Sequence, residues 1–398
     1  MFDLDDAEER DAADPLASWR DEFVVPDPDL AYLDGNSLGR TPRRTVEALR
    51  RVVEQEWAGD LISSWWANGW LDLPLTVGDA LAPLVGARPG EVAVHDSTTV
   101  CLFQLVNAAI DLRRARSGPD GDSPVVVAVE NTEFPTDRYV IEGIARLRAS
   151  GDAPRVEIRR GVADLDGVGV VVRSLVDYRT AELASLTDET RRATEAGAVT
   201  VWDLSHAVGV VALDLESSGA EFAAGCTYKF LNGGPGAPAF TYVRSSIQSA
   251  VVQPIWGWFG QRDQFAMDNA FDARDGIGRL LSGTPGILGL TAAAAGISVS
   301  AEAGIDAIAR KATALSTYAI DLATDLGLHC PTSRPPSSSG GHVSILHPDA
   351  ASLQRRLARE KVVVDKRDPD VLRVGLSPLT TRFVDVHRGL TTLASLLA

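Results

Sequence analysis

Continuous apolar segments alternate with helical patterns through the first half of this chain. "SPVVVAVE" (123–130), "GVGVVVRSLV" (167–176) and "AVTVW" (198–202) are apolar at almost every position. The helical patterns "TDRYVIEGIARLR" and "TDETRRATEAGA" come between them. A strand that is apolar on both faces belongs inside a sheet that helices cover on both sides. The alternation therefore predicts an α/β fold with a parallel sheet.

The pattern changes in the last third of the chain. With 398 residues the chain is long for a single hydrophobic core, which favours two domains. After residue 290 comes a long helical stretch, and "VVVDKRDPDVLRVGLS" (362–377) follows as a strand, a turn and a strand. We expect an N-terminal arm at 1–44 that joins the small domain, a large domain at 45–290, and a small α+β domain at 291–398.

Composition excludes several classes of function. The net charge of −16 disfavours nucleic acid and anionic membranes as partners. The three cysteines are far apart, and His95 and His342 have no partner ligands at metal spacing, so we predict neither disulfides nor a metal site. The first residues, "MFDLDDAEERDAAD", lack the apolar core of a signal peptide. These features indicate a cytoplasmic protein.

A lysine and an aspartate stand out against apolar surroundings. Lys229 lies in "CTYKFLNGGPG" (226–236), and Asp203 directly follows the strand "AVTVW". Taken alone, the lysine would extend to solvent and the aspartate would cap a helix. A desolvated lysine, however, keeps a free amine that can add to an aldehyde. A strand-end Asp followed by such a Lys is similar to a pyridoxal-phosphate (PLP) site, where the Lys forms the Schiff base and the Asp holds the pyridine nitrogen.

Other polar residues near strand ends fit such a site. Thr98 and Thr99 begin the helical pattern "TTVCLFQLVNAAIDLRRAR", and a helix N-terminus attracts a phosphate. Ser or Thr at a helix start is more often only a cap. Phe134 and Asp137 follow one apolar strand, and Ser174 follows the next. The Phe could stack on a cofactor ring or belong to the core.

A series of motifs spans nearly the whole chain, from residue 32 to residue 386. Through these motifs the chain resembles kynureninase, a family of the aspartate-aminotransferase (fold-type I) superfamily. The resemblance implies a large domain with a mostly parallel seven-stranded sheet, a smaller C-terminal domain, and a role in tryptophan catabolism. The motifs are "YLDGNSLGRTP", "FPTD", "DLSHAVG", "CTYKFLNGGPG", "GWFG", "FAMDN", "SGTP", "GGHVSI" and "DKRDPDVLRVGLSPL".

The resemblance also implies roles for individual residues. Lys229 would bind PLP covalently and move the proton from the substrate's Cα, and Asp203 would pair with the pyridinium nitrogen. Tyr228 is a candidate proton donor in the later steps. The residues implied to line the cofactor are Thr98, Thr99, Phe134, Asp137, Ser174, Asp203, His206, Tyr228, Lys229, Trp258 and Thr284.

Two of these residues would come from a second subunit. Trp258 and Thr284 would reach the cofactor of the partner, so the resemblance implies a homodimer with shared active sites. Arg373 would bind the substrate's α-carboxylate as a bidentate fork. Ser37 and Trp65 would contact the far end of the substrate. Alternatively, Trp258 is a core residue and Arg373 a surface ion pair.

The implied reaction is hydrolysis of L-kynurenine to anthranilate and L-alanine. Trp65, in "SWWANGW", stands where the animal enzymes that prefer 3-hydroxykynurenine carry a histidine. We therefore favour unsubstituted kynurenine, although a substituted kynurenine stays open. Cys101 and Ala181 depart from the family pattern, in which Asn and Gly are usual at these positions.

Two alternatives from other classes stay open at this point. A cysteine desulfurase of the same superfamily needs a cysteine on a mobile loop, and Cys330 is followed by a serine-rich stretch. However, "LGLHCPTS" predicts a strand end, and desulfurases usually have His where this chain has Tyr228. A PLP-binding regulator is the other alternative, but the acidic N-terminus argues against a DNA-binding module.

Overall fold

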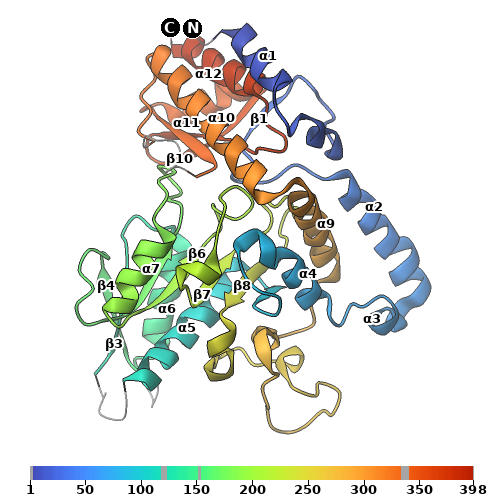
Figure 1. Ribbon diagram of the computed structural model, residues 1–398, viewed down its shortest axis with the longest axis vertical. Coiled ribbons are helices and arrows are strands. Elements are labelled where there is room, and N and C mark those ends of the chain that lie inside the picture. The colour runs from blue at the N-terminus through green and yellow to red at the C-terminus, as the bar shows by residue number, and fades with distance from the viewer. Residues whose placement is uncertain (1–2, 118–122, 151–153, 333–339, 398) are drawn as a thin grey trace.

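The computed structural model describes residues 3–117, 123–150, 154–332 and 340–397. Two sheets organise these residues, a seven-stranded one and a four-stranded one. In Figure 1 the small sheet and its helices lie above the large sheet, and both chain ends lie together at the top. The serine-rich stretch after Cys330 falls at 333–339, outside the described residues.

The large sheet is mostly parallel, as the apolar strands predicted. Its strand order is β2-β8-β7-β6-β5-β3-β4; β8 runs antiparallel to both of its neighbours, and the pairs from β7 to β4 are parallel. The strands are β2 (Val92–His95), β3 (Val125–Val129), β4 (Val156–Arg160), β5 (Val168–Ser174), β6 (Val199–Asp203), β7 (Phe222–Gly225) and β8 (Ala239–Val243).

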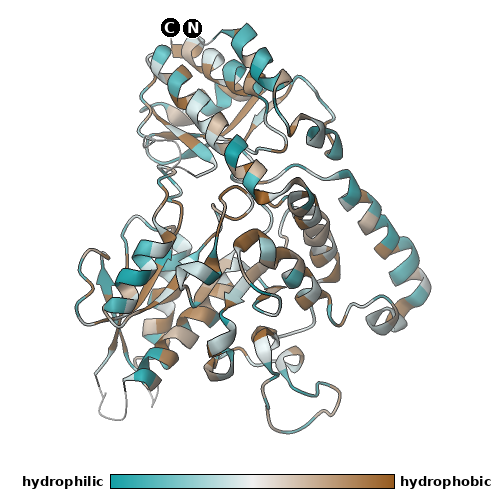
Figure 2. Ribbon diagram, in the orientation of Figure 1, coloured by the Kyte–Doolittle hydropathy of each residue, from teal (hydrophilic) through white to brown (hydrophobic). Residues whose placement is uncertain are grey.

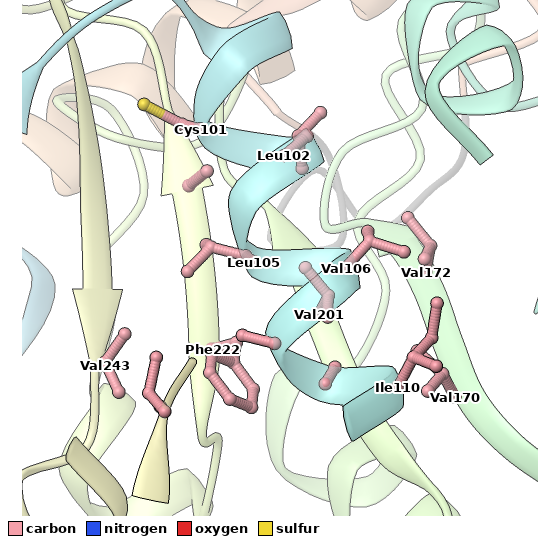
Figure 3. Close-up of a cluster of buried hydrophobic side chains, with 14 of the residues drawn as sticks. Cys101, Leu102, Leu105, Val106, Ile110, Val170, Val172, Val201, Phe222 and Val243 are labelled. Atoms are coloured by element: carbon pink, nitrogen blue, oxygen red, sulfur yellow. The ribbon is translucent and has the colours of Figure 1, made fainter. Parts of the chain in front are cut away.

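Helices cover this sheet, and the one at 98–116 has the predicted limits. It begins where the Ser97 side chain accepts a hydrogen bond from the Val100 N–H. Leu105, Val106 and Ile110 point from it onto the sheet in a closely packed cluster (Figure 3). The helices around the sheet are α4 (Leu73–Leu81), α5 (Thr98–Arg116), α6 (Pro135–Leu147), α7 (Leu186–Glu195), α8 (Leu215–Ser218) and α9 (Ile287–Ala303). Farther out, α2 (Arg43–Arg51) packs against α9, and α3 (Ser64–Ala67) lies near the end of α2 (Figure 1).

The small sheet combines the two ends of the chain. Its order is β1-β10-β11-β9, with β1 parallel to β10 and the other pairs antiparallel. Its strands are β1 (Ala31–Leu33), β9 (His342–Leu346), β10 (Val362–Arg367) and β11 (Val371–Gly375). The accompanying helices are α1 (Leu4–Ala12), α10 (Ile305–Asp325), α11 (Ala350–Arg359) and α12 (Phe383–Leu397). The predicted strand end at Cys330 is wrong, because residues 328–332 are irregular.

The long helical stretch after residue 290 is two helices that meet at Gly304. Gly304 has φ of 82°, and the axes of α9 and α10 differ by 84°. Leu290 and Ile297 of α9 pack in the core of the large sheet, and α9 is brown over most of its length in Figure 2. The domain limits stay a prediction. Because α9 packs on the large sheet, the limit between the two domains would lie at Gly304 rather than at residue 290.

Among the described residues no single helix is long and apolar enough to cross a membrane. Helices α9 and α10 meet that length and composition only as a bent pair.

A loop after β1 joins the two parts of the molecule. Gly39 N–H donates to the Tyr228 carbonyl at 2.9 Å, and a Cβ on Gly39 would lie 2.3 Å from the Lys229 carbonyl oxygen. At the other end of the loop, a Cβ on Gly35 would lie 1.7 Å from Ser377 Oγ. The glycines therefore let one short segment touch both the Lys229 segment and the end of β11.

We predict that Gly39→Ala destabilises the fold by about 1–3 kcal/mol, because the added methyl group meets fixed backbone. Urea unfolding measures this change. Gly59→Ala is the matched control, since a Cβ there meets nothing within 4 Å. The control should be neutral or stabilise by up to about 1 kcal/mol. Equal stability of the two variants would contradict the close approach.

Candidate active site

A cavity of about 180 Å³ lies at the carboxyl ends of the parallel strands. Nine of the residues predicted to line a cofactor do line it: Thr98, Thr99, Phe134, Asp137, Ser174, Asp203, His206, Tyr228 and Lys229. Sequence reasoning missed Ser97, Thr136, Val176, Tyr178 and Ser205, which line it too. Most of the missed residues are direct or near neighbours of predicted ones, so adjacency was the available signal.

Strand pairing explains why residues far apart in the sequence meet here. Ser174 ends β5 and Asp203 ends β6, and these two residues are partners in the parallel register. Ser174 Oγ lies 3.4 Å from the Asp137 carboxylate at the start of α6. The helix α5 begins at Thr98, on the same cavity. One edge of the sheet thus gathers two carboxylates, hydroxyl groups and a helix N-terminus.

Lys229 follows β7 on a segment with little freedom. Its Nζ lies 2.9 Å from His206 Nε2 and 5.9 Å from the centre of the Tyr228 ring. Burial lowers the pKa of His206 well below its ordinary value, and the positive charge of Lys229 adds to this effect. The His206 imidazole is therefore neutral beside the amine.

The glycines after Lys229 do not line this cavity. Asn232, Gly234 and Gly236 have φ values of 56°, 90° and 70°, so they form tight turns that favour glycine. Gly233 N–H donates to the Thr227 carbonyl at 2.9 Å. This segment closely approaches the protein's own backbone, since a Cβ on Gly233 would lie 2.9 Å from the Thr227 carbonyl oxygen.

Three carboxyl groups are buried on one side of the cavity. Burial raises the pKa of Asp203, while the Ser205 contacts and Lys229 act against it. Asp137 has a pKa well above its ordinary value because of burial and the charges of Asp203 and Glu133. Burial also raises the pKa of Glu133 to about 7. Carboxyl groups this close to one another cannot all be ionised unless a cation lies beside them.

This donor set fits PLP at each of its ends. The amine of Lys229 suits an aldehyde, and the buried carboxylate of Asp203 suits a protonated pyridine nitrogen. Thr98 and Thr99, at the first turn of α5, suit a phosphate because a helix N-terminus offers free N–H groups. Phe134 lies at the wall, held edge-to-face against Tyr178 at 5.3 Å.

Arg373 and Ser37 lie next to each other but outside this cavity. Arg373 is fully buried, and its Nη2 lies 3.4 Å from Ser37 Oγ. Its Nε and Nη2 both donate to Asp365, and its Nη1 donates to the Tyr178 carbonyl at 2.8 Å. Burial lowers the pKa of Arg373, and the Asp365 carboxylate acts against this. The surface ion pair considered for Arg373 is thus wrong.

Asp34, three residues before Ser37, belongs to the same cluster and was not predicted. Its Oδ1 is buried and has no hydrogen-bond partner among the described residues. Burial raises the pKa of Asp34 to about 6, while Ser37 acts against this and Asp365 adds to it.

A third group of predicted residues lies apart from both the cavity and the Arg373 cluster, and it consists of Trp258, Thr284 and Trp65. Trp258 Nε1 lies 3.3 Å from Thr284 Oγ1, and Trp258 is 39% exposed. Phe259 joins this pair to Trp65, with ring centres 4.8 Å from Trp258 and 6.0 Å from Trp65. None of these side chains lines the cavity of Lys229 in the same chain. Their predicted roles stay predictions.

We predict that burial of Glu133 makes the fold less stable as pH rises. Its pKa is about 7 in the folded protein against an ordinary 4.5, so the folded state binds this proton more tightly. The resulting stabilisation is complete below pH 4.5 and is lost as pH rises through 7. Relative to Glu133→Gln, the wild type should lose up to about 3 kcal/mol over that range. Urea unfolding at several pH values measures the difference.

Glu157→Gln, at an exposed glutamate, is the control for the exchange of a carboxylate for an amide, and the slope of Glu133→Gln is compared with it. A constant difference between wild type and Glu133→Gln would contradict the burial of a titrating carboxyl group.

The chain is similar to proteins of one family over nearly its whole length. Residues 308–393 match the model of the kynureninase C-terminal domain. A kynureninase of Pseudomonas fluorescens is 38% identical over 399 residues, covering 97% of this chain and 94% of the relative. A kynureninase of Burkholderia pseudomallei (strain 1106a) is 39% identical over 394 residues, with the same coverage of both chains.

Solved structures agree with the fold. A cysteine desulfurase of Thermococcus onnurineus NA1 in its apo form has a TM-score of 0.79 at 17% identity, covering 95% of this chain and 97% of that one. A variant of C-DES, with glycine covalently linked to its PLP cofactor, has a TM-score of 0.77 at 15% identity, covering 93% and 99%. At these identities the likeness shows the fold alone.

Proposed function

The chain belongs to the kynureninase family of PLP-dependent hydrolases, and from this membership we propose that it converts L-kynurenine and water to anthranilate and L-alanine. The proposal depends chiefly on one observation. Lys229, Asp203 and the start of α5 line a single cavity, and their polar groups complement those of PLP. The desulfurase alternative lacks such support, because Cys330 packs beside the small-sheet core and does not line the cavity.

When bound, PLP supplies an electron sink that makes the substrate's Cα proton acidic. Lys229 Nζ removes that proton, and the neutral His206 imidazole at 2.9 Å holds the amine in place. Asp203 keeps the ring nitrogen of the cofactor protonated. The charge of that nitrogen offsets part of the cost of burying Asp203 beside Asp137.

Water adds to the γ-carbonyl of the substrate, and the bond between Cβ and Cγ breaks. The aryl acid leaves. To give alanine, Lys229 returns a proton to Cα, and Cβ takes up one proton. Tyr228 is positioned for this transfer, since its ring lies beside Lys229 on the cavity wall. Burial raises the pKa of Tyr228, so the phenol keeps its proton at neutral pH.

Arg373 binds the substrate's α-carboxylate, with Ser37 beside it. The Tyr178 carbonyl accepts a hydrogen bond from Arg373 Nη1, and Tyr178 also lines the cofactor cavity. The chain at Tyr178 therefore separates the arginine from the cavity. Substrate binding requires this wall to move or the carboxylate to enter past it.

We also propose a homodimer with shared active sites in the cytoplasm. Large apolar side chains are exposed around α3 and the loop after β8, where Trp66 contacts Phe265 at 5.9 Å. An exposed apolar patch of this kind marks an interface. Exposed apolar side chains on and near these segments are Trp57 (56%), Ile62 (72%), Trp66 (62%), Trp256 (60%) and Met267 (72% exposed). Trp258 and Thr284, on the loop after β8, would reach the partner's site.

We expect the enzyme to prefer kynurenine over 3-hydroxykynurenine by about 10- to 100-fold in kcat/KM, because Trp65 offers the extra hydroxyl a poor partner. Anthranilate fluorescence and absorbance assays give both values. Lys229→Ala is the control for background hydrolysis and should show no turnover. Activity in Lys229→Ala, or none in the wild type with either substrate, would contradict the proposed function.

A test of the shared site is complementation between two inactive variants. In a mixed dimer of one Lys229→Ala chain and one Trp258→Ala chain, a shared site places both defects in one active site and leaves the other intact. Equal mixing during refolding should restore about a quarter of wild-type activity, because half of the dimers then contain one intact site. If each chain completes its own site, the mixture stays inactive.

A further inference from the structure

His342 is a buried histidine that the proposed mechanism does not use. It begins β9 in the small sheet, and its side chain is fully buried. Neither of its ring nitrogens has a hydrogen-bond partner among the described residues. The Tyr178 backbone lies close enough to raise the pKa of His342, but it makes no hydrogen bond of acceptable geometry with the imidazole ring. Buried polar groups are rarely left so, because an unmade hydrogen bond costs stability.

The surroundings of His342 are those of the active site. Its ring centre lies 5.8 Å from that of His206, whose Nε2 contacts Lys229 Nζ. In the sheet register Arg373 pairs with Ser344 and His342 pairs with Gly375, so Arg373 and His342 point from the same face. His342 therefore lies between His206, which contacts Lys229, and Arg373, which is proposed to bind the substrate's carboxylate.

Charge and burial define what His342 can bind. Burial lowers the pKa of His342 well below its ordinary value, and the positive charges of Arg373, Lys229 and Arg367 lower it further. A neutral imidazole in a cluster of cations has one N–H to donate and suits an anion. No group of three or more metal-ligating side chains occurs in the described part of the chain, so a metal does not explain it.

We propose that His342 donates a hydrogen bond to the α-carboxylate of the amino-acid substrate, beside Arg373. This inference depends on the proposed function and adds a second carboxylate ligand to it. The Tyr178 carbonyl accepts a hydrogen bond from Arg373 Nη1, and the Tyr178 backbone lies close to His342. A carboxylate oxygen that replaces this carbonyl would meet both donors.

The test compares two ligands of the PLP-loaded enzyme, L-alanine and L-alaninamide, which differ only in the carboxylate. Equilibrium titration followed by the cofactor's visible absorbance gives each Kd. His342→Ala should weaken L-alanine by about 10- to 100-fold, the usual effect of losing a hydrogen bond to a charged group. L-Alaninamide should bind wild type and variant alike. His342→Gln, whose amide reaches as far, should recover most of the affinity.

His329→Ala is the matched control, because His329 is exposed at the surface, and it should bind both ligands like wild type. If His342→Ala does not fold, His342→Asn replaces it, since the shorter amide cannot reach. Equal loss for both ligands, or no loss for L-alanine, would overturn the inference. Kynurenine hydrolysis by the wild type is measured separately, so failure of the proposed function is recognised on its own.

Discussion

The site depends on one close backbone contact, that of Gly39 with the Lys229 segment. This contact and that of Gly35 with Ser377 fix the loop at 34–40 between the large sheet and the small one. The loop carries Ser37 to Arg373 and Asp365. Because two glycines lack side chains, the loop holds the Lys229 segment of one sheet at a fixed distance from Arg373 of the other. A substrate with an amine and a carboxylate needs that distance to be fixed.

Electrostatics in the cavity are arranged for a cation that the chain does not supply. Asp203, Asp137 and Glu133 are buried together, and their pKa values are all raised. Lys229 is the nearby positive group inside the cavity, and Arg173 contacts Glu133 at 3.3 Å from outside it. A protonated pyridine ring beside Asp203 would relieve this strain, so the unfavourable charge is itself a binding determinant. On the small-sheet side, Arg373 and Arg367 both donate hydrogen bonds to Asp365.

Local patterns predicted the apolar parallel strands, the helix at 98–116 and seven of the nine cavity residues, because strand ends of a parallel sheet converge. The other two, His206 and Tyr228, came from the family resemblance. Local patterns did not predict features that depend on distant contacts. In the sequence Glu133 has the features of an exposed loop residue, and its burial follows from contacts with Arg173 and Ser174, which are distant in the sequence. The break at Gly304 was missed because alanine-rich sequence runs on both sides of it. The roles of Trp65 and Trp258 stay predictions, because neither side chain lines the chain's own cavity.

The most direct test of the account is to find where PLP attaches. The chain has four lysines, and the other three are Lys311, Lys361 and Lys366, each paired with an aspartate. Loading with PLP, reduction with borohydride and peptide mass spectrometry locate the pyridoxyl group. The account predicts a single modified residue, Lys229. Modification at another lysine, or none at Lys229, would contradict it.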